Sequence, residues 1–251
     1  MLTKRYCIRL LFNANKVFDR QVIAGIGNYL QAAQCDWDIF LEEDFRSRLE
    51  HLSEWQGDGI IADFDDPQVE ALLLHSTTPV VAVGGSYQQL DQYPSRRPYI
   101  ASDNFALVEQ AYQHLKSKGL QQFALYGLPQ EPGNRWALQR ELAFTALMQR
   151  DNFKPTIYRG QNTAAETWPE SMSQLSDWLQ ALPQPIGIIA VTDSRARHLL
   201  QSCDQLGIRV PDQSAIIGID NEKMARYLNR VSLSSVGQGC HRIGYEAAKE
   251  L

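Results

Sequence analysis

Short apolar runs alternate with longer amphipathic stretches along this chain. Most runs are followed by polar residues, after which apolar positions recur at the three- and four-residue spacing of a helix. The pattern predicts buried parallel strands connected by helices. The runs that we interpret as strands are YCIRLLF, WDIFLEE, GIIADF, PVVAVGG, YIAS, FALYG, TIYRG, GIIAVT, SAIIGID and VSLSSV.

Capping residues mark both ends of two predicted helices. DNFALVEQAYQHLKSKG starts with Asp103 as a candidate N-cap and ends with Gly119 as a candidate C-cap. DSRARHLLQSCDQLG repeats this arrangement with Asp193 and Gly207. A further helix is expected over RIGYEAAKEL, which runs to the last residue without a Gly or Pro stop and suggests a truncated chain.

The predicted strands are too many for one sheet with this helix spacing, so we expect an α/β fold of two doubly wound parallel-sheet lobes. The first lobe is placed at residues 1–110 and takes back the tail 234–251, and the second lobe is placed at residues 111–233.

Composition narrows the class of protein. The chain has 251 residues, 44% hydrophobic and 21% charged, with a net charge of −5, which is a globular balance and argues against a bare nucleic-acid-binding module. No apolar run nears the ~20 residues of a membrane span, and the N-terminus has no signal-peptide cleavage pattern, so we expect a cytoplasmic protein. No cysteine pair has CxxC spacing, and neither a disulfide nor a metal site is expected.

Polar and aromatic residues follow the strand ends, where ligands of such sheets bind. Carboxylates, amides and guanidiniums suit a sugar, because each hydroxyl both donates and accepts a hydrogen bond, and aromatic rings pack on its C–H faces. The ligand-binding candidates are Asn13, Phe18, Asp19, Arg20, Tyr87, Asp103, Trp136, Arg140, Asp193, Asp220 and Gln238.

Simpler roles stay open for these residues. Asp103 and Asp193 are good helix caps, and Asn13 is typical of a turn. Phe18 suits a hydrophobic staple, and Asp19 suits a solvated ion pair with its neighbour. Arg140 could simply be an exposed helix residue, and Trp136 could be a core residue. The run Asp63, Asp65 and Asp66 superficially resembles a metal cluster, but we interpret it as a solvated turn.

The order of the elements and several motifs resemble the periplasmic sugar-binding-protein fold, which lactose- and galactose-type repressors reuse. LFNANKVFDRQVIAGI is similar to the first strand, binding loop and helix of those repressors. RELAF resembles their Arg-x-x-Gly-Phe segment and marks Arg140 as a sugar-clasping arginine. VTDSRARHLLQSCDQLGIRVPDQSAIIGIDNE resembles their signature, which marks Asp220 as the second-lobe carboxylate, and Gln238 sits where sugar-binding members carry a glutamine. The resemblance implies two lobes with a hinge and a ligand cleft between them.

Two departures point to one group within this fold. The first strand starts near residue 6, which leaves no room for the N-terminal helix-turn-helix of lactose-type repressors, and no signal peptide precedes it. FNANKVFDRQ, EWQGDGIIADFDD, VGGSY, YGLPQ, RWALQRE and IAVTDSRARH resemble the family of xylose operon regulators. That family implies D-xylose as the ligand, no cofactor, and a homodimeric activator that reaches DNA through an AraC-type domain expected after residue 251.

An α/β enzyme acting on a sugar or phosphosugar is the alternative. The sequence shows no P-loop, no G-x-S-x-G nucleophile elbow and no His–carboxylate metal set. We therefore expect a sensor rather than an enzyme. Turnover of a bound sugar would decide for the enzyme, and unchanged sugar with a DNA-linked effect would decide for the sensor.

Overall fold

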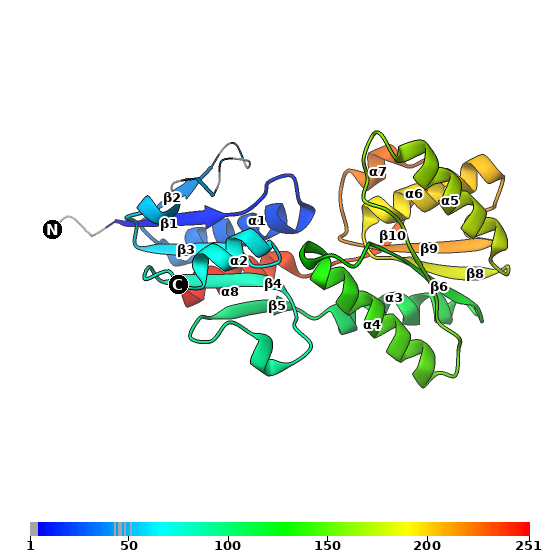
Figure 1. Ribbon diagram of the computed structural model, residues 1–251, viewed down its shortest axis with the longest axis horizontal. Coiled ribbons are helices and arrows are strands. Elements are labelled where there is room, and N and C mark those ends of the chain that lie inside the picture. The colour runs from blue at the N-terminus through cyan, green and yellow to red at the C-terminus, as the bar shows by residue number, and fades with distance from the viewer. Residues whose placement is uncertain (1–4, 43, 45–46, 48, 51) are drawn as a thin grey trace. The chain divides into compact units, whose positions relative to one another are not determined.

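The computed structural model describes residues 5–42, 44, 47, 49–50 and 52–251. The chain divides into two compact units, which Figure 1 shows. Unit 1 comprises Met1–Ser102 and Gly239–Leu251, and unit 2 comprises Asp103–Gln238. Each unit holds one five-stranded parallel sheet, so the predicted fold class is confirmed.

The sheet of unit 1 has the strand order β2-β1-β3-β4-β5, and that of unit 2 has the order β10-β9-β8-β6-β7. The bounds of the strands are β1 (Tyr6–Leu11), β2 (Trp37–Leu41), β3 (Gly59–Asp63), β4 (Val80–Gly85), β5 (Tyr99–Ser102), β6 (Phe123–Gly127), β7 (Thr156–Arg159), β8 (Ile186–Ala190), β9 (Ser214–Ile219) and β10 (Ser234–Val236). Nine of them lie within a run that the sequence pattern assigned to a strand, and β8 begins one residue before its run GIIAVT, at Ile186.

Helices connect the strands. Their bounds are α1 (Val17–Ala33), α2 (Pro67–Leu73), α3 (Asn104–Ser117), α4 (Arg135–Arg150), α5 (Trp168–Ala181), α6 (Asp193–Leu206), α7 (Ala225–Leu228) and α8 (Cys240–Glu250). Short 3₁₀ turns are η1 (Leu52–Glu54), η2 (Leu90–Gln92) and η3 (Pro132–Asn134). No helix in the described part of the chain is both long and apolar enough to cross a membrane.

Alternate residues of each strand feed two separate cores, because side chains of a strand point to opposite faces of the sheet. In unit 1, Ile61 packs with α1 and α8, whereas Ile60 and Ala62 pack with α2. In unit 2, Ile189 packs with α3 and α4, whereas Ile188 packs with α5 and α6. Burial on both faces explains why the strands are continuous apolar runs rather than alternating ones.

The last helix of the chain lies beside the first one. Figure 1 shows red α8 next to blue α1, and both pack on the same core of unit 1. Two glycines allow the approach: a Cβ at Gly25 would lie 2.0 Å from the carbonyl oxygen of His241, and one at Gly244 would lie 1.9 Å from that of Val22. The tail therefore completes unit 1, although β10 just before it belongs to the sheet of unit 2.

The predicted caps hold in part. Asp103 caps α3, where its Oδ1 accepts from the N–H of Ala106 at 2.9 Å, and Gly207 ends α6 in the left-handed conformation with φ +67°. Asp193 is not the cap of α6. Thr192 takes that place and accepts from the N–H of Arg195 at 3.1 Å, which leaves the Asp193 carboxylate to bond elsewhere.

Candidate functional site

Arg140 is the centre of a buried polar cluster at the carboxyl edge of the unit 2 sheet. It lies in the second turn of α4 and is only 2% exposed. Its Nε donates to Oδ1 of Asn104 at 2.9 Å, and its Nη1 donates to the carbonyl oxygen of Val191, just after β8. The guanidinium carbon stands 4.7 Å from the ring centroid of Trp136, a cation–π contact. The structure thus brings together two sequence-predicted residues, Trp136 and Arg140.

Asp220 joins the same cluster from the end of β9. It is 6% exposed, its Oδ1 accepts from Nε2 of Gln238, and its Oδ2 lies 3.4 Å from the backbone nitrogen of Asp193. Burial raises the pKa of Asp220 to about 7, although the positive charge of Arg140 opposes the rise; the charge of Asp193 adds to it. Near neutral pH this carboxyl group is therefore able both to donate and to accept a hydrogen bond.

Asp193 is buried as well, but its carboxylate bonds to its own unit. Oδ1 accepts from the hydroxyl of Ser235 at 2.6 Å, and Oδ2 accepts from the N–H of Glu222 at 2.7 Å. Burial raises the pKa of Asp193, while these two hydrogen bonds act in the opposite direction. Asp193 lies near the end of β8, as the sequence predicted, but both oxygens of its carboxylate accept hydrogen bonds from unit 2 itself.

Asn104 is part of the Arg140 cluster but was not among the sequence-predicted candidates. It is 1% exposed, and its Nδ2 has no hydrogen-bond partner among the described residues. An unpaired buried amide costs about 1–3 kcal/mol, so its presence at a strand end suggests that a ligand or water completes it. The sequence signal was available, because Asn104 is the second residue after β5, next to the candidate Asp103.

The loop after β1 forms a second cluster, in unit 1. Oδ2 of Asp19 accepts from the N–H of Asn13 at 2.5 Å, and its Oδ1 is buried without a partner among the described residues. Burial and the nearby charge of Asp63 raise the pKa of Asp19 well above its usual range, and Lys16 acts against them. The structure thus joins two of the candidate residues, Asn13 and Asp19, by a hydrogen bond, and the buried Asp19 does not form the solvated ion pair that was its simpler role.

Lys16 is the residue of this loop that sequence reasoning missed. Its Nζ lies 2.8 Å from Oδ2 of Asp63, which comes from the end of β3. Burial by itself would lower the pKa of Lys16, but the charges of Asp63 and Asp19 outweigh burial and raise it. The ammonium therefore stays charged and balances part of the acidic cluster.

The interpretation of Asp63 and Asp65 as a solvated turn was wrong. Asp63 is 2% and Asp65 is 9% exposed. Asp63 accepts from the N–H of Asp65 at 2.9 Å, and Asp65 accepts from the N–H of Gly85 at 2.7 Å. Only Asp66 keeps a local role, as the N-cap of α2. Among the described residues, no group of three or more His, Cys, Asp or Glu is arranged to hold a metal ion.

The remaining sequence-predicted residues lie away from these bonds. Phe18 packs against the core of unit 1, and the exposed Arg20 donates from Nη1 to the carbonyl oxygen of Ala14 at 2.9 Å. The hydroxyl of Tyr87 donates to Glu70 at 2.8 Å. Asp103 is exposed and caps α3, as described above. The bonds and packing of these four residues are local to their own unit, and only Asp103 has the simpler role, a helix cap, in the form that the sequence suggested.

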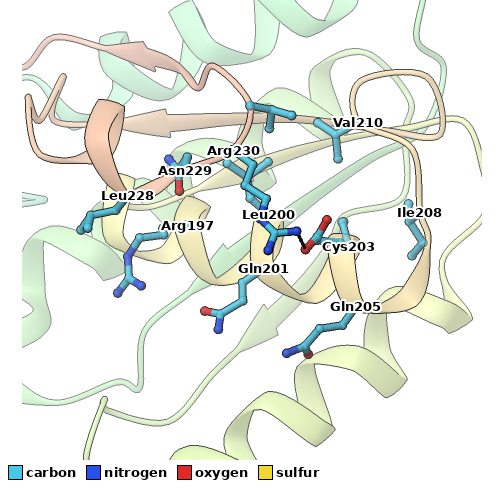
Figure 2. Close-up of a pocket in the computed structure, with 12 residues that line it drawn as sticks. Arg197, Leu200, Gln201, Cys203, Gln205, Ile208, Val210, Leu228, Asn229 and Arg230 are labelled. Atoms are coloured by element: carbon cyan, nitrogen blue, oxygen red, sulfur yellow. Dashed lines mark hydrogen bonds and ion pairs between the residues drawn. The ribbon is translucent and has the colours of Figure 1, made fainter.

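A separate hollow lies on unit 2, beside α6, and none of the candidate residues lines it. Figure 2 shows this groove of about 470 Å³ between α6 and the segment from Leu228 to Val231, with the Arg230–Asp204 ion pair of 3.0 Å at its side. Its walls mix apolar residues with mostly exposed polar ones, and although the buried Nδ2 of Asn229 has no partner among the described residues, no buried charged side chain lines the groove as Arg140 and Asp220 do in the Arg140 cluster. The polar clusters at the strand ends are therefore the better candidate site.

The chain is similar in sequence and in structure to several known proteins. The chain is 55% identical over all 251 residues to the xylose operon regulatory protein of Escherichia coli K12, of which it covers 64%, and 52% identical to that of Haemophilus influenzae, of which it covers 65%. The solved structure of a xylose-binding transcription activator matches 99% of the chain and 63% of that protein, with a TM-score of 0.90 and 54% identity. The chain thus spans about two thirds of the length of these relatives.

The relatives are named as transcription regulators and not as enzymes, so the comparison favours the sensor over the enzyme. The model of the XylR N-terminal domain matches residues 7–105, and the model of the periplasmic binding protein-like domain matches residues 112–251, more than half of the chain. The chain therefore belongs to the periplasmic-binding-protein-like family, in the group that carries the XylR N-terminal domain and resembles the xylose operon regulatory proteins.

Proposed function

We propose that this chain is the sugar-sensing module of a cytoplasmic transcription activator and that D-xylose is its ligand. The names of the relatives support the choice of sugar and of biological role. The observation that carries the proposal physically is the Arg140 cluster, whose guanidinium and carboxylate are buried beside an amide with an unpaired N–H₂ group.

The Arg140 cluster has the chemistry that a sugar requires. Arg140 and Asn104 offer donors, Asp220 offers acceptors, and Gln238 fixes the Asp220 carboxylate through its amide. Vicinal hydroxyls pair with such groups as simultaneous donors and acceptors, and the face of Trp136 suits the C–H surface of a pyranose. Buried polar groups also give specificity, because an analogue that lacks a hydroxyl leaves its partner unpaired.

The proposal also includes polar groups of unit 1 as sugar-binding groups. Asn13 and Asp19 provide hydrogen-bonding groups at the end of β1, and Lys16 adds a positive charge beside them. Phe18 offers a partly buried ring. In this proposal the sugar contacts both units and favours the state in which both sets of contacts are made at once.

The regulatory consequence follows from that shift in population. A homodimeric full-length protein would present its AraC-type DNA-binding domains, which we expect after residue 251, differently with and without sugar. The coupling is limited by the difference in sugar affinity between the two states.

The test is calorimetric titration of the chain with D-xylose, and then with L-arabinose, D-ribose and D-glucose. We expect saturable binding of D-xylose, weaker or no binding of the others, and recovery of unchanged sugar. Absence of binding by all four sugars, or appearance of a product, would refute the proposed function.

Two variants test whether the Arg140 cluster binds the sugar. Asp220→Ala should weaken D-xylose binding by about 2–4 kcal/mol, because it removes a buried carboxylate whose partners stay behind. Asp204→Ala is the control, since Asp204 lies in the same unit, is 57% exposed and forms an ion pair with Arg230. Wild-type affinity of Asp220→Ala would remove Asp220 from the site.

A further inference from the structure

We infer that Asp193 is a positioning residue, which holds the turn that presents Asp220 and does not itself contact the sugar. The inference rests on the proposed function for the ligand, but its structural part concerns the turn from Asp220 to Glu222 and is independent of any sugar.

Both oxygens of the Asp193 carboxylate are already engaged within unit 2. Oδ1 accepts from the Ser235 hydroxyl at 2.6 Å, and Oδ2 accepts from the Glu222 N–H at 2.7 Å. The side chain is enclosed as well: Asp193 is 2% exposed, and a Cβ at Gly218 would lie 2.1 Å from its Oδ1. A sugar hydroxyl would have to displace one of these bonds to reach the carboxylate.

These bonds converge on a strained turn. Asp220 has φ +138° and Asn221 has φ +51°, values that L-residues rarely adopt and that persist only when the surroundings impose them. Asp193 holds Glu222 directly. It also orients the Ser235 hydroxyl, which accepts from the Asn221 N–H at 2.9 Å. One carboxylate therefore fixes two consecutive amides immediately after Asp220.

The same residue also touches the presented carboxylate. The backbone nitrogen of Asp193 lies 3.4 Å from Oδ2 of Asp220, at the first position of α6. Asp220 is thus held at Oδ1 by Gln238, through its backbone N–H by the Val236 carbonyl at 3.0 Å, and in its turn by the Asp193 network. Losing the network should displace Asp220 without removing any group that contacts the sugar.

The first measurement needs no sugar. Hydrogen exchange of the Asn221 and Glu222 amides is followed by NMR in the wild type, Asp193→Asn, Ser235→Ala and the control Asp204→Asn, which lies on the same helix. We expect exchange at both amides to rise about tenfold in Asp193→Asn, and at the Asn221 amide in Ser235→Ala, because each substitution removes an oxygen that accepts from an amide or that orients the accepting hydroxyl. Unchanged exchange in Asp193→Asn would overturn the inference even if D-xylose binds.

The second measurement separates positioning from contact. D-xylose and its 2-, 3- and 4-deoxy analogues are titrated into the wild type, Asp193→Asn, Asp220→Asn, Ser235→Ala and the Asp193→Asn/Ser235→Ala double variant. We expect Asp193→Asn and Ser235→Ala each to weaken D-xylose binding up to about tenfold, with a combined loss smaller than the product of the two, since both act through one turn.

The deoxy sugars identify the hydroxyl involved. If Asp193 acts through Asp220, the analogue that is insensitive to Asp220→Asn is also insensitive to Asp193→Asn. Direct contact predicts three other results: Asp193→Asn is insensitive to a different analogue, Ser235→Ala leaves D-xylose affinity unchanged, and the losses of the single variants multiply in the double variant. These results together would refute positioning. Failure of the wild type to bind any pentose would refute the proposed function alone, because amide exchange still decides the role of Asp193.

Discussion

The buried guanidinium of Arg140 compensates part of the negative charge of two buried carboxylates in unit 2. Its positive charge lowers the pKa of both Asp193 and Asp220. It does not fully offset their burial, since the pKa of Asp220 remains about 7. A buried carboxylate that is only partly compensated favours its protonated form, which is unusual for an aspartate in a structural role.

Stability should therefore fall as pH rises through the titration of Asp220. Its pKa is raised from 3.8 to about 7, so between these values the folded chain holds a proton that the unfolded chain has released. The contribution to unfolding free energy is largest below about pH 4, declines as pH rises to about 7, and is constant above. The unfolding free energy of Asp220→Asn relative to that of the wild type should therefore be roughly 2–3 kcal/mol higher at pH 8 than at pH 5.

Urea unfolding at pH 5 and pH 8 measures this difference. The comparison of wild type with Asp220→Asn cancels the other titrating groups, including Asp19 and Asp193, whose pKa values are also raised. An equal effect of the substitution at both pH values would contradict the raised pKa.

Arg140→Lys should be costly although it keeps the charge. Lysine has no planar fork to serve Asn104 and the Val191 carbonyl at once, and it places its charge differently above Trp136. We expect a loss of about 1–3 kcal/mol in stability from the unpaired buried groups, together with weaker D-xylose binding. Arg209→Lys is the matched control, because Arg209 is 70% exposed. Thermal unfolding and calorimetry check the pair, and equal behaviour of the two variants would count against this role of Arg140.

The site was predictable residue by residue only where one position carries the signal. Asp220 and Gln238 stand in recognisable motifs at strand ends and Arg140 in one on a helix, and the structure gathers them. Lys16 and Asp63 were missed, since their ion pair joins the start of α1 to the end of β3 across 47 positions of sequence. A polar run after a strand looks the same whether solvent or a folded neighbour surrounds it.

At the scale of elements, the contact between α1 and α8 explains a glycine pattern that the sequence left without a role. The two glycines of GIGNYL, Gly25 and Gly27, differ completely in their surroundings. A Cβ at Gly25 would meet the His241 backbone, as a Cβ at Gly244 would meet that of Val22, whereas Gly27 has no atom within 4 Å of the position of its Cβ. Backbone approach this close requires the absence of a side chain.

Alanine substitutions at these glycines should therefore have opposite effects. Gly244→Ala inserts a methyl group into the backbone of α1 and should destabilise unit 1 by about 1–3 kcal/mol or more, because neither helix can move away without opening the core. Gly27→Ala should stabilise α1 by about 0.5–1 kcal/mol, since alanine loses less entropy in a helix. Differential scanning calorimetry of both variants tests the pair, and a neutral Gly244→Ala would show that the helices do not approach this closely.

At the scale of the whole molecule, each unit has its own sheet and its own pair of cores. The chain passes between the units at Ser102–Asp103 and again at Gln238–Gly239. Unit 2 is continuous in sequence, whereas unit 1 needs α8 from the far end of the chain to cover the face that holds Ile8 and Val81.

The two units should thus differ as isolated fragments. Residues 103–238 should fold on their own, because all partners of that sheet and both of its cores are included. Residues 1–102 should not fold cooperatively, since they lack Ile243 and Ala247 of the α1–α8 core. Urea unfolding and NMR dispersion of the fragments are the measurements. A cooperative 1–102 fragment, or an unfolded 103–238 fragment, would contradict this account.

The sequence by itself determined the ten strands and the parallel α/β architecture, because strands buried on both faces must be continuous apolar runs and their helices must be amphipathic. It also indicated which strand ends carry polar chemistry. Only the tertiary structure decided which of those groups are buried and to what they bond: Asp63 and Asp65 lie inside, Asp103 lies outside, and Asp193 holds a turn. Burial and long-range pairing arise when distant segments meet, and no local pattern encodes them.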